Sequence, residues 1–151
     1  MKIMLAAVVP RRSRAKAEGI DGLVNEYVQR AARYVPVESA LFESEEILLE
    51  SIARQPGRAA AHLVLLDSRG QTLTSEEFAK YLGRQRDDGA QRMTLAIGPA
   101  DGWSDTARTR AQMLFSLGRI TLPHELARVV LAEQVYRALT ILAGHPYHSG
   151  H

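Results

Sequence analysis

The sequence contains no cysteine, which excludes disulfide bonds and thiolate metal ligands and gives no sign of an oxidising compartment. It also has no stretch near the ~20 apolar residues that a membrane-spanning helix needs. Neither charge sign dominates, because 19 Lys and Arg stand against 17 Asp and Glu. These absences predict a soluble cytoplasmic protein without a membrane partner, and the small net charge permits nucleic-acid binding without requiring it.

What the sequence does contain is a regular alternation of apolar strands with helical patterns. Predicted strands cover residues 2–9, 36–43, 61–67, 93–98 and 119–122. Predicted helices cover residues 17–34, 44–55, 74–87, 104–117 and 123–143, and a turn is expected at 68–70. This order predicts an α/β fold with a mostly parallel sheet and helices on both faces. A length of 151 residues suits a single domain that can bury its own core.

The last predicted helix is apolar around nearly its whole circumference. Pro123 suits its first turn, and Gly144 with Pro146 ends it. A helix of this kind must be buried on both sides, either at the centre of one subunit or against a partner. We expect a homodimer, with a two-fold contact that buries Val129, Val130, Val135, Tyr136 and Leu139.

A second feature is the basic segment between the first strand and the first helix. Four cations fall within six residues: Arg11, Arg12, Arg14 and Lys16. Such a cluster would attract the phosphates of RNA, although a solvated surface loop would have the same composition.

Three loops stand out, because in a parallel sheet ligands gather at the loops outside the carboxyl ends of the strands. These loops are Leu66–Asp67, Gly98–Gly102 and Leu117–Leu122. None matches a nucleotide motif: there is no G-x-x-x-x-G-K-[ST], and two glycines alone do not make a dinucleotide fingerprint. The pattern alone therefore predicts only a small ligand where glycines let the backbone approach it.

The last third of the chain resembles a known family. The residues concerned are Thr121-Leu-Pro-His124, Arg128, Ala132-Glu-Gln-Val-Tyr-Arg-Ala138 and His145-Pro-Tyr-His148. They closely resemble the end of the RlmH family, SPOUT-class methyltransferases that methylate N3 of a pseudouridine in large-subunit ribosomal RNA. The resemblance implies a single SPOUT domain with a C-terminal trefoil knot, S-adenosylmethionine as cofactor, ribosomal RNA as partner and a homodimer.

The resemblance also implies site residues. The implied cofactor contacts are Leu66, Gly98, Leu117, Gly118, Arg119, Ile120, Thr121 and Leu122. In the family the Tyr-His tail lies over the cofactor pocket and helps receive the RNA base. This makes Tyr147 and His148 the candidate catalytic residues, and His145 joins the basic segment as an RNA contact.

The chain departs from the family pattern at two places. Near the second loop the family has Ile-Gly-Gly-Pro-Glu-Gly, whereas this chain has Pro99 and Asp101. After the first strand the usual Gly-Lys is replaced by Val9-Pro10. Two alternatives therefore stay open: a non-catalytic RNA-binding or cofactor-sensing relative, and a methyltransferase that acts on another RNA.

Histidines at positions 145, 148 and 151 raise the possibility of a metal site. They lie on a terminal tail without a nearby carboxylate, which does not favour a shaped ligand set, so no metal is expected. We interpret His62 as a surface residue and His124 as a hydrogen-bonding residue at a helix start.

Overall fold

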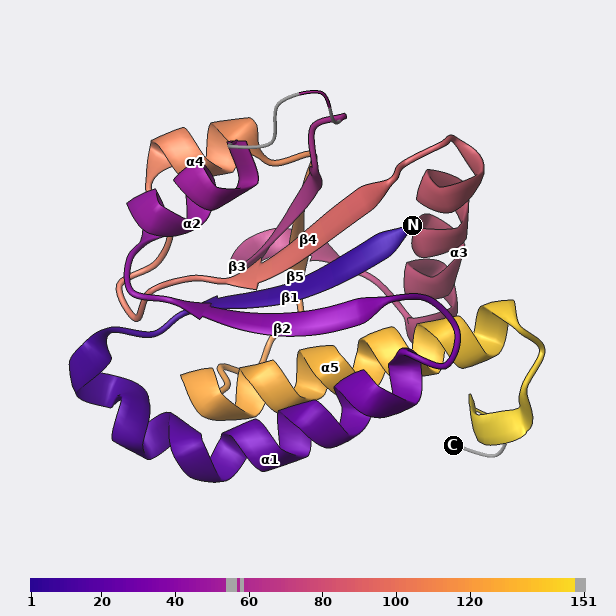
Figure 1. Ribbon diagram of the computed structural model, residues 1–151, viewed down its shortest axis with the longest axis horizontal. Coiled ribbons are helices and arrows are strands. Elements are labelled where there is room, and N and C mark those ends of the chain that lie inside the picture. The colour runs from indigo at the N-terminus through magenta and orange to yellow at the C-terminus, as the bar shows by residue number, and fades with distance from the viewer. Residues whose placement is uncertain (54–56, 58, 149–151) are drawn as a thin grey trace.

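The computed structural model describes residues 1–53, 57 and 59–148, and Figure 1 shows their arrangement. In this part of the chain five strands form one parallel sheet in the order β2-β1-β4-β3-β5. The strands are β1 (Lys2–Val8), β2 (Val37–Phe42), β3 (His62–Thr72), β4 (Arg92–Ile97) and β5 (Met113–Ser116). The helices are α1 (Arg14–Ala31), α2 (Glu45–Ala53), α3 (Ser75–Asp87), α4 (Asp105–Arg110) and α5 (His124–Leu142), with short 3-10 helices η1 (Arg11–Ser13) and η2 (Pro146–His148).

The sheet is covered on both faces, as the alternation predicted (Figure 1). Successive side chains of a strand point to opposite faces, so Leu5 of β1 joins the core under α1, α3 and α5, whereas Ala6 joins the core under α2 and α4. In the central register Leu5 pairs with Leu95 of β4, and both are buried. Burial on both faces explains why these strands read as continuous apolar runs.

Two predicted helix starts are confirmed by their capping bonds. The Thr74 side chain accepts from the Glu77 N–H at 3.1 Å, while Glu77 accepts from the Thr74 N–H at 2.8 Å. Ser104 accepts from the Ala107 N–H at 3.1 Å at the start of α4. Capping hydrogen bonds can be predicted from the sequence because they join residues only three positions apart.

Three predictions about chain segments are wrong. The segment 68–70 is not a turn, because β3 continues to Thr72, with a register shift against β5 between Leu66 and Gln71. The helix that starts at Ser104 ends at Arg110, and Met113–Ser116 forms β5 beside β3. Residues 119–122 form no strand. The short run after α4 gains ladder hydrogen bonds from β3, a long-range partner that local periodicity cannot reveal.

The basic segment is more ordered than a loop. It forms η1 and the first turn of α1, which begins at Arg14 rather than near residue 17. The prediction failed here because no apolar residue of the helical pattern precedes Ala17.

Helix α5 lies between α1 and α3 on one face of the sheet (Figure 1). Val135 and Leu139, both predicted at a dimer contact, belong to the core of this chain, with 0% and 5% of their surface exposed. Val129, Val130 and Tyr136 are half-buried. A central position in one subunit therefore accounts for much of the apolar circumference. The trefoil knot implied by the resemblance stays a prediction. Within the described residues, no helix has the length and apolarity to cross a bilayer.

His62 is not a plain surface residue. Its Nε2 is hydrogen-bonded to the Tyr81 hydroxyl, which joins β3 to α3. Burial lowers the pKa of His62 from 6.5 and raises the pKa of Tyr81 to about 12.

This pair predicts a pH-dependent stability. A depressed imidazole pKa means that the unfolded chain binds more protons than the folded protein just below pH 6.5. The neutral His62 side chain therefore stabilises the folded protein fully above pH 6.5, and this stabilisation is lost as the pH falls toward the pKa of His62 in the folded protein. We expect the urea midpoint to fall more steeply between pH 7 and pH 5, roughly the range of a histidine titration, than in His62→Gln. Parallel midpoint curves for the two proteins would contradict this.

Candidate functional site

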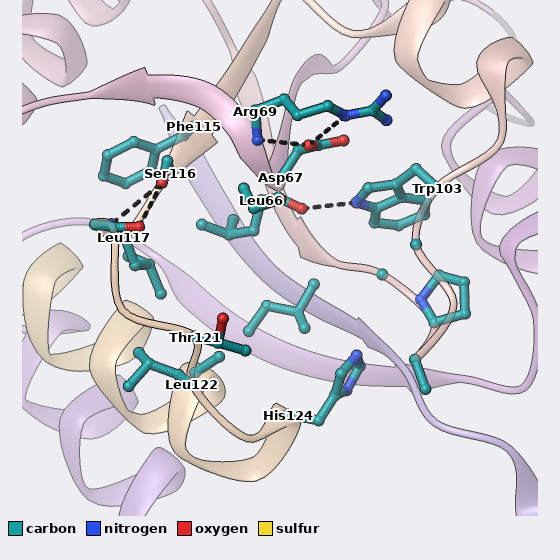
Figure 2. A pocket seen from close by; sticks show the side chains of 18 of the residues that line it. Leu66, Asp67, Arg69, Trp103, Phe115, Ser116, Leu117, Thr121, Leu122 and His124 are labelled. Carbon is teal, nitrogen blue, oxygen red and sulfur yellow. Dashed lines mark hydrogen bonds and ion pairs between the residues drawn. The ribbon is translucent and has the colours of Figure 1, made fainter.

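A cavity of about 480 Å³ opens at the carboxyl ends of β4 and β5 and beside the middle of β3, where Leu66–Asp67 belongs to the strand and not to the loop that was expected (Figure 2). All eight residues that the resemblance assigned to cofactor contacts line it: Leu66, Gly98, Leu117, Gly118, Arg119, Ile120, Thr121 and Leu122. They come from three separate segments between residues 66 and 122, so the fold brings them together. The position outside the strand ends is where parallel sheets bind ligands.

Trp103 forms one wall of this cavity. Its indole N–H donates to the Leu66 carbonyl at 2.9 Å, and only 5% of its surface is exposed (Figure 2). Its ring lies so close to Gly98 that an added Cβ there would stand 2.6 Å from ring atom Cε2. The Trp103 carbonyl in turn accepts from Arg108. The glycine loop is therefore fixed by packing and hydrogen bonds. Trp103 was not among the predicted site residues, although a lone tryptophan beside a glycine loop was a signal.

Asp67 and Arg69 form the edge of the cavity next to Leu66. Asp67 Oδ1 accepts from the Arg69 main-chain N–H at 2.8 Å and from its Nε at 3.4 Å. Burial alone would raise the pKa of the Asp67 carboxyl, but the hydrogen bonds from Arg69 and the positive charges of Arg69 and Arg108 outweigh it and lower the pKa. Asp67 thus provides an ionised acceptor for a ligand hydroxyl or amine.

The opposite wall is the irregular segment after β5. The Ser116 hydroxyl accepts from the Gly118 N–H at 3.2 Å and donates to the Gly118 carbonyl at 3.0 Å, which closes the segment back on β5. Leu117, Thr121 and Leu122 face the cavity (Figure 2). Ile120 also lines it, but 81% of its surface is exposed. A segment without regular structure offers unpaired main-chain donors and acceptors that can read a polar ring edge.

The predicted catalytic tail lies far from this cavity. His124 at the start of α5 lines the cavity, while η2 follows the other end of a helix about 28 Å long. The Tyr147 hydroxyl donates to Glu133 Oε2 at 3.0 Å, and its ring centre lies 4.6 Å from that of Tyr136. His145 is exposed at the same end. The side chain of His148 lies outside the described residues.

The surroundings of Tyr147 also limit its chemistry. Burial and the hydrogen bond to Glu133 raise the pKa of Tyr147 to about 12. In this arrangement the phenol stays protonated near neutral pH and is a hydrogen-bond donor, not a base. The catalytic roles of Tyr147 and His148 stay predictions, and they require the cavity of another copy of the chain.

The basic residues differ in their contacts. Arg11 lies 4.0 Å from Glu43 and Arg14 Nε donates to the Val9 carbonyl at 3.2 Å. Arg12 lines a second cavity of about 410 Å³. The side chain of Lys16 lies outside the described residues. Of the three arginines in this basic segment, Arg12 is the one that lines a cavity next to the candidate cofactor site in the described structure.

No group of three His, Cys, Asp or Glu side chains is placed to hold a metal ion within the part of the chain that the structure describes. That part leaves out His151 and the His148 side chain, so the terminal histidine spacing is not tested.

The chain matches a family model described as predicted SPOUT methyltransferase over residues 1–148. The chain belongs to the SPOUT methyltransferase family. It is 51% identical over 138 residues to ribosomal RNA large subunit methyltransferase H of Koribacter versatilis, which covers 91% of this chain and 94% of that protein. This similarity over nearly the full length confirms the predicted membership of the RlmH family.

Two further proteins are similar over part of their length. The protein of the same name from Brucella abortus strain S19 is 56% identical over 88 residues, which is 58% of this chain and 52% of that protein. The crystal structure of the SpoU methyltransferase AviRb from Streptomyces viridochromogenes, in complex with the cofactor AdoMet, matches with a TM-score of 0.49 and 12% identity. That match covers 96% of this chain and 58% of AviRb.

Proposed function

We propose that this SPOUT family member transfers a methyl group from S-adenosylmethionine to large-subunit ribosomal RNA, at N3 of a pseudouridine. The observation that carries the proposal is the convergence of all eight implied cofactor residues on one cavity. The 51% identity to a ribosomal RNA large subunit methyltransferase over nearly the whole chain supports the substrate class. A ribosomal substrate also implies a cytoplasmic location.

The cavity has the chemical character that the cofactor needs. Apolar side chains of Leu66, Leu117 and Leu122 can enclose a flat ring, while main-chain groups of the same segments can bond its polar edge. The ionised Asp67 carboxylate suits hydroxyl or ammonium groups. The residues present therefore fit S-adenosylmethionine, which supplies an electrophilic methyl group on a sulfonium.

The chain's own contribution to the reaction is positioning. With the cofactor held by the residues of the cavity, its sulfonium would supply the methyl group to N3 of the base, and the N3 proton would pass to an acceptor. A fixed wall of Trp103 and Gly98 holds one reactant and reduces the entropy cost of the encounter.

The direct test uses labelled S-adenosylmethionine and ribosomes that lack the modification. We expect label in the large-subunit RNA, and its loss when the target pseudouridine is replaced by uridine. Calorimetry with the cofactor separates the alternatives. Binding without transfer would indicate a cofactor-sensing relative, and label in another RNA would indicate the same chemistry on a different substrate.

We further propose that the chain acts as a homodimer. Ile120 and Leu126 expose 81% and 48% of their surfaces at the start of α5, beside the cavity. The half-buried Val129 and Val130 continue the apolar surface along the helix. A self-complementary contact here would cover these side chains. Leu139, also expected at the contact, does not suit a test of the dimer, because an acidic group there would disrupt the core of the chain itself.

Leu126→Glu should convert the dimer to a folded monomer and lower the affinity for ribosomes. The matched control is Ile47→Glu on α2, on the other face of the sheet, where 46% of the side chain is exposed. Light scattering after size exclusion measures the mass, and circular dichroism verifies folding. A monomeric unmodified protein with full transfer activity would overturn the proposed dimer.

A further inference from the structure

A second cavity adjoins the cofactor cavity. It lies between the carboxyl end of β1, the start of α1, the glycine loop and the start of α5. Four residues line both cavities: Pro99, Ala100, Asp101 and His124. With a volume of about 410 Å³ it is in the range of ligand pockets in general. Neither the proposed cofactor contacts nor the family resemblance assigns it a ligand.

Arg128 of α5 lines this cavity and is nearly fully buried, with 7% of its side chain exposed. Its Nη2 forms an ion pair with Asp21 Oδ1 at 2.8 Å. Arg128 Nη1 and Asp21 Oδ1 are both buried without a hydrogen-bond partner among the described residues, so the contact between the two side chains is an ion pair by distance and lacks hydrogen-bond geometry. Buried polar groups are nearly always hydrogen-bonded, so an orphaned guanidinium nitrogen at a cavity indicates an acceptor that binds there.

The start of α1 faces the same cavity. Ser13, its N-cap, and Ala17 both line the cavity, and the Ser13 side chain makes no capping bond within the described part of the chain. Residues 14–17 include no acid to complement the positive end of this 18-residue helix. The positive end of the helix dipole favours an anion at this position. The exposed side chain of Arg12 adds a second full positive charge at the same end.

The opposite end of the cavity has a different chemistry. Asp101 and His124 stand at the border with the cofactor cavity, and Glu125 follows His124 in the first turn of α5. Carboxylates repel a phosphate but accept hydrogen bonds from the N–H groups of a nucleobase. The cavity is therefore cationic near α1 and acidic near the methyl donor's site.

We propose that this second cavity binds one nucleotide of the target RNA, with its phosphate on Arg128 Nη1, Arg12 and the start of α1. The base then points past Asp101 and His124 toward the cofactor cavity, which places its N–H groups beside the Asp101 carboxylate. This inference rests on the proposed function for the identity of the RNA. The anion site itself rests on the geometry alone.

The first test uses uridine 5′-monophosphate, uridine and inorganic phosphate as probes, with amide and guanidinium NMR signals of the labelled full-length protein. We expect the monophosphate and inorganic phosphate to shift the signals of Ser13, Ala17 and Arg128. Uridine should bind these positions roughly tenfold more weakly than its monophosphate, the difference that one charge-assisted contact typically makes. Equal affinities for uridine and its monophosphate would overturn the proposal, as would phosphate shifts confined to other surfaces.

The second test compares two adjacent arginines. Arg11 and Arg12 are both exposed and carry the same charge, but only Arg12 lines the second cavity in the described structure. Arg12→Ala should weaken binding of the monophosphate and of unmodified ribosomes by roughly tenfold. It should also reduce the slope of the logarithm of ribosome affinity against the logarithm of salt concentration by about one. Arg11→Ala should change both by less than about twofold, as a general field effect of one distant charge. Equal losses for the two variants would mean that the segment acts only by its net charge.

Arg128→Lys is the third variant, because it keeps the charge but loses the planar fork of donors. We expect loss of the monophosphate shifts with unchanged affinity for S-adenosylmethionine. If this variant is unstable, the comparison of Arg11 with Arg12 still decides the question. Phosphate binding at this site in a protein that transfers no methyl group would refute the proposed function but support the anion site. Methyl transfer without phosphate binding would support the proposed function but refute the anion site.

Discussion

Replacing Gly98 by alanine should lower the affinity for S-adenosylmethionine by roughly tenfold to a hundredfold. The new Cβ would stand 2.6 Å from Cε2 and 2.8 Å from Nε1 of Trp103, well inside contact distance. The indole is a rigid, buried ring, so it must leave its place and give up its hydrogen bond to Leu66. Overpacking of this kind costs about 1 to 3 kcal/mol, and here the displaced ring moves the cavity wall. Titration calorimetry measures the effect.

The matched control for this variant is Gly22→Ala in α1, where an added Cβ meets nothing within 4 Å. Alanine inside a helix is more favourable than glycine by roughly 0.5 to 1 kcal/mol, so this control should be slightly stabilised with unchanged cofactor affinity. Wild-type affinity in Gly98→Ala would show that the ring can shift freely, and the cavity wall would not be fixed as described.

Gly70→Ala should destabilise the fold by about 3 kcal/mol or more. Gly70 lies in the extension of β3 against the backbone of β5, and an added Cβ would stand 2.6 Å from the Phe115 nitrogen and closer still to the carbonyl of Leu114. Backbone cannot rotate away as a side chain can, so the two strands must separate. Phe115 would then lose its stacking on Phe78, whose ring centre is 4.9 Å away. Urea unfolding measures the loss.

Gly83→Ala provides the contrast for this prediction. An added Cβ at Gly83 would also be too close to a neighbour, 2.9 Å from Leu142 Cδ2, but that atom is the tip of a flexible side chain. We expect a loss of no more than about 1 kcal/mol there, because the leucine can change rotamer. Similar losses at both glycines would contradict the distinction between backbone and side-chain neighbours.

Elements that depend on residues close together in the sequence were predicted correctly, whereas an element that depends on a distant strand was missed. The capping box at Thr74 and the strand around Val64 and Leu65 were predicted because the necessary residues are adjacent in sequence. The strand β5 was missed because it depends on β3, some 50 residues earlier. The same β3–β5 contact explains why β3 extends beyond its predicted end at residue 67. Apolar periodicity records burial but not the partner that provides it.

The candidate site was also predicted only in part. The resemblance supplied the eight cofactor residues, and the structure brings all of them to one cavity. It could not supply the arrangement around Arg128, whose partner Asp21 lies more than 100 residues away on another helix. The tail is the opposite case: its residues were named from sequence, but in this chain Tyr147 packs on Glu133 at the far end of α5. The candidate site residues were thus easier to predict than the side chains that they contact in the folded protein.

The single tryptophan has a practical consequence. Because Trp103 is the chain's only indole and stands in the cavity wall, all tryptophan fluorescence of the protein arises beside the candidate cofactor site. Its emission reports the polarity around one ring and the hydrogen bond of that ring to Leu66. Filling or emptying of the cavity can therefore be followed in real time, without a dye, a label or a second reporter, and in the presence of unlabelled RNA. The residue that shapes the wall is also a natural optical probe of its occupancy.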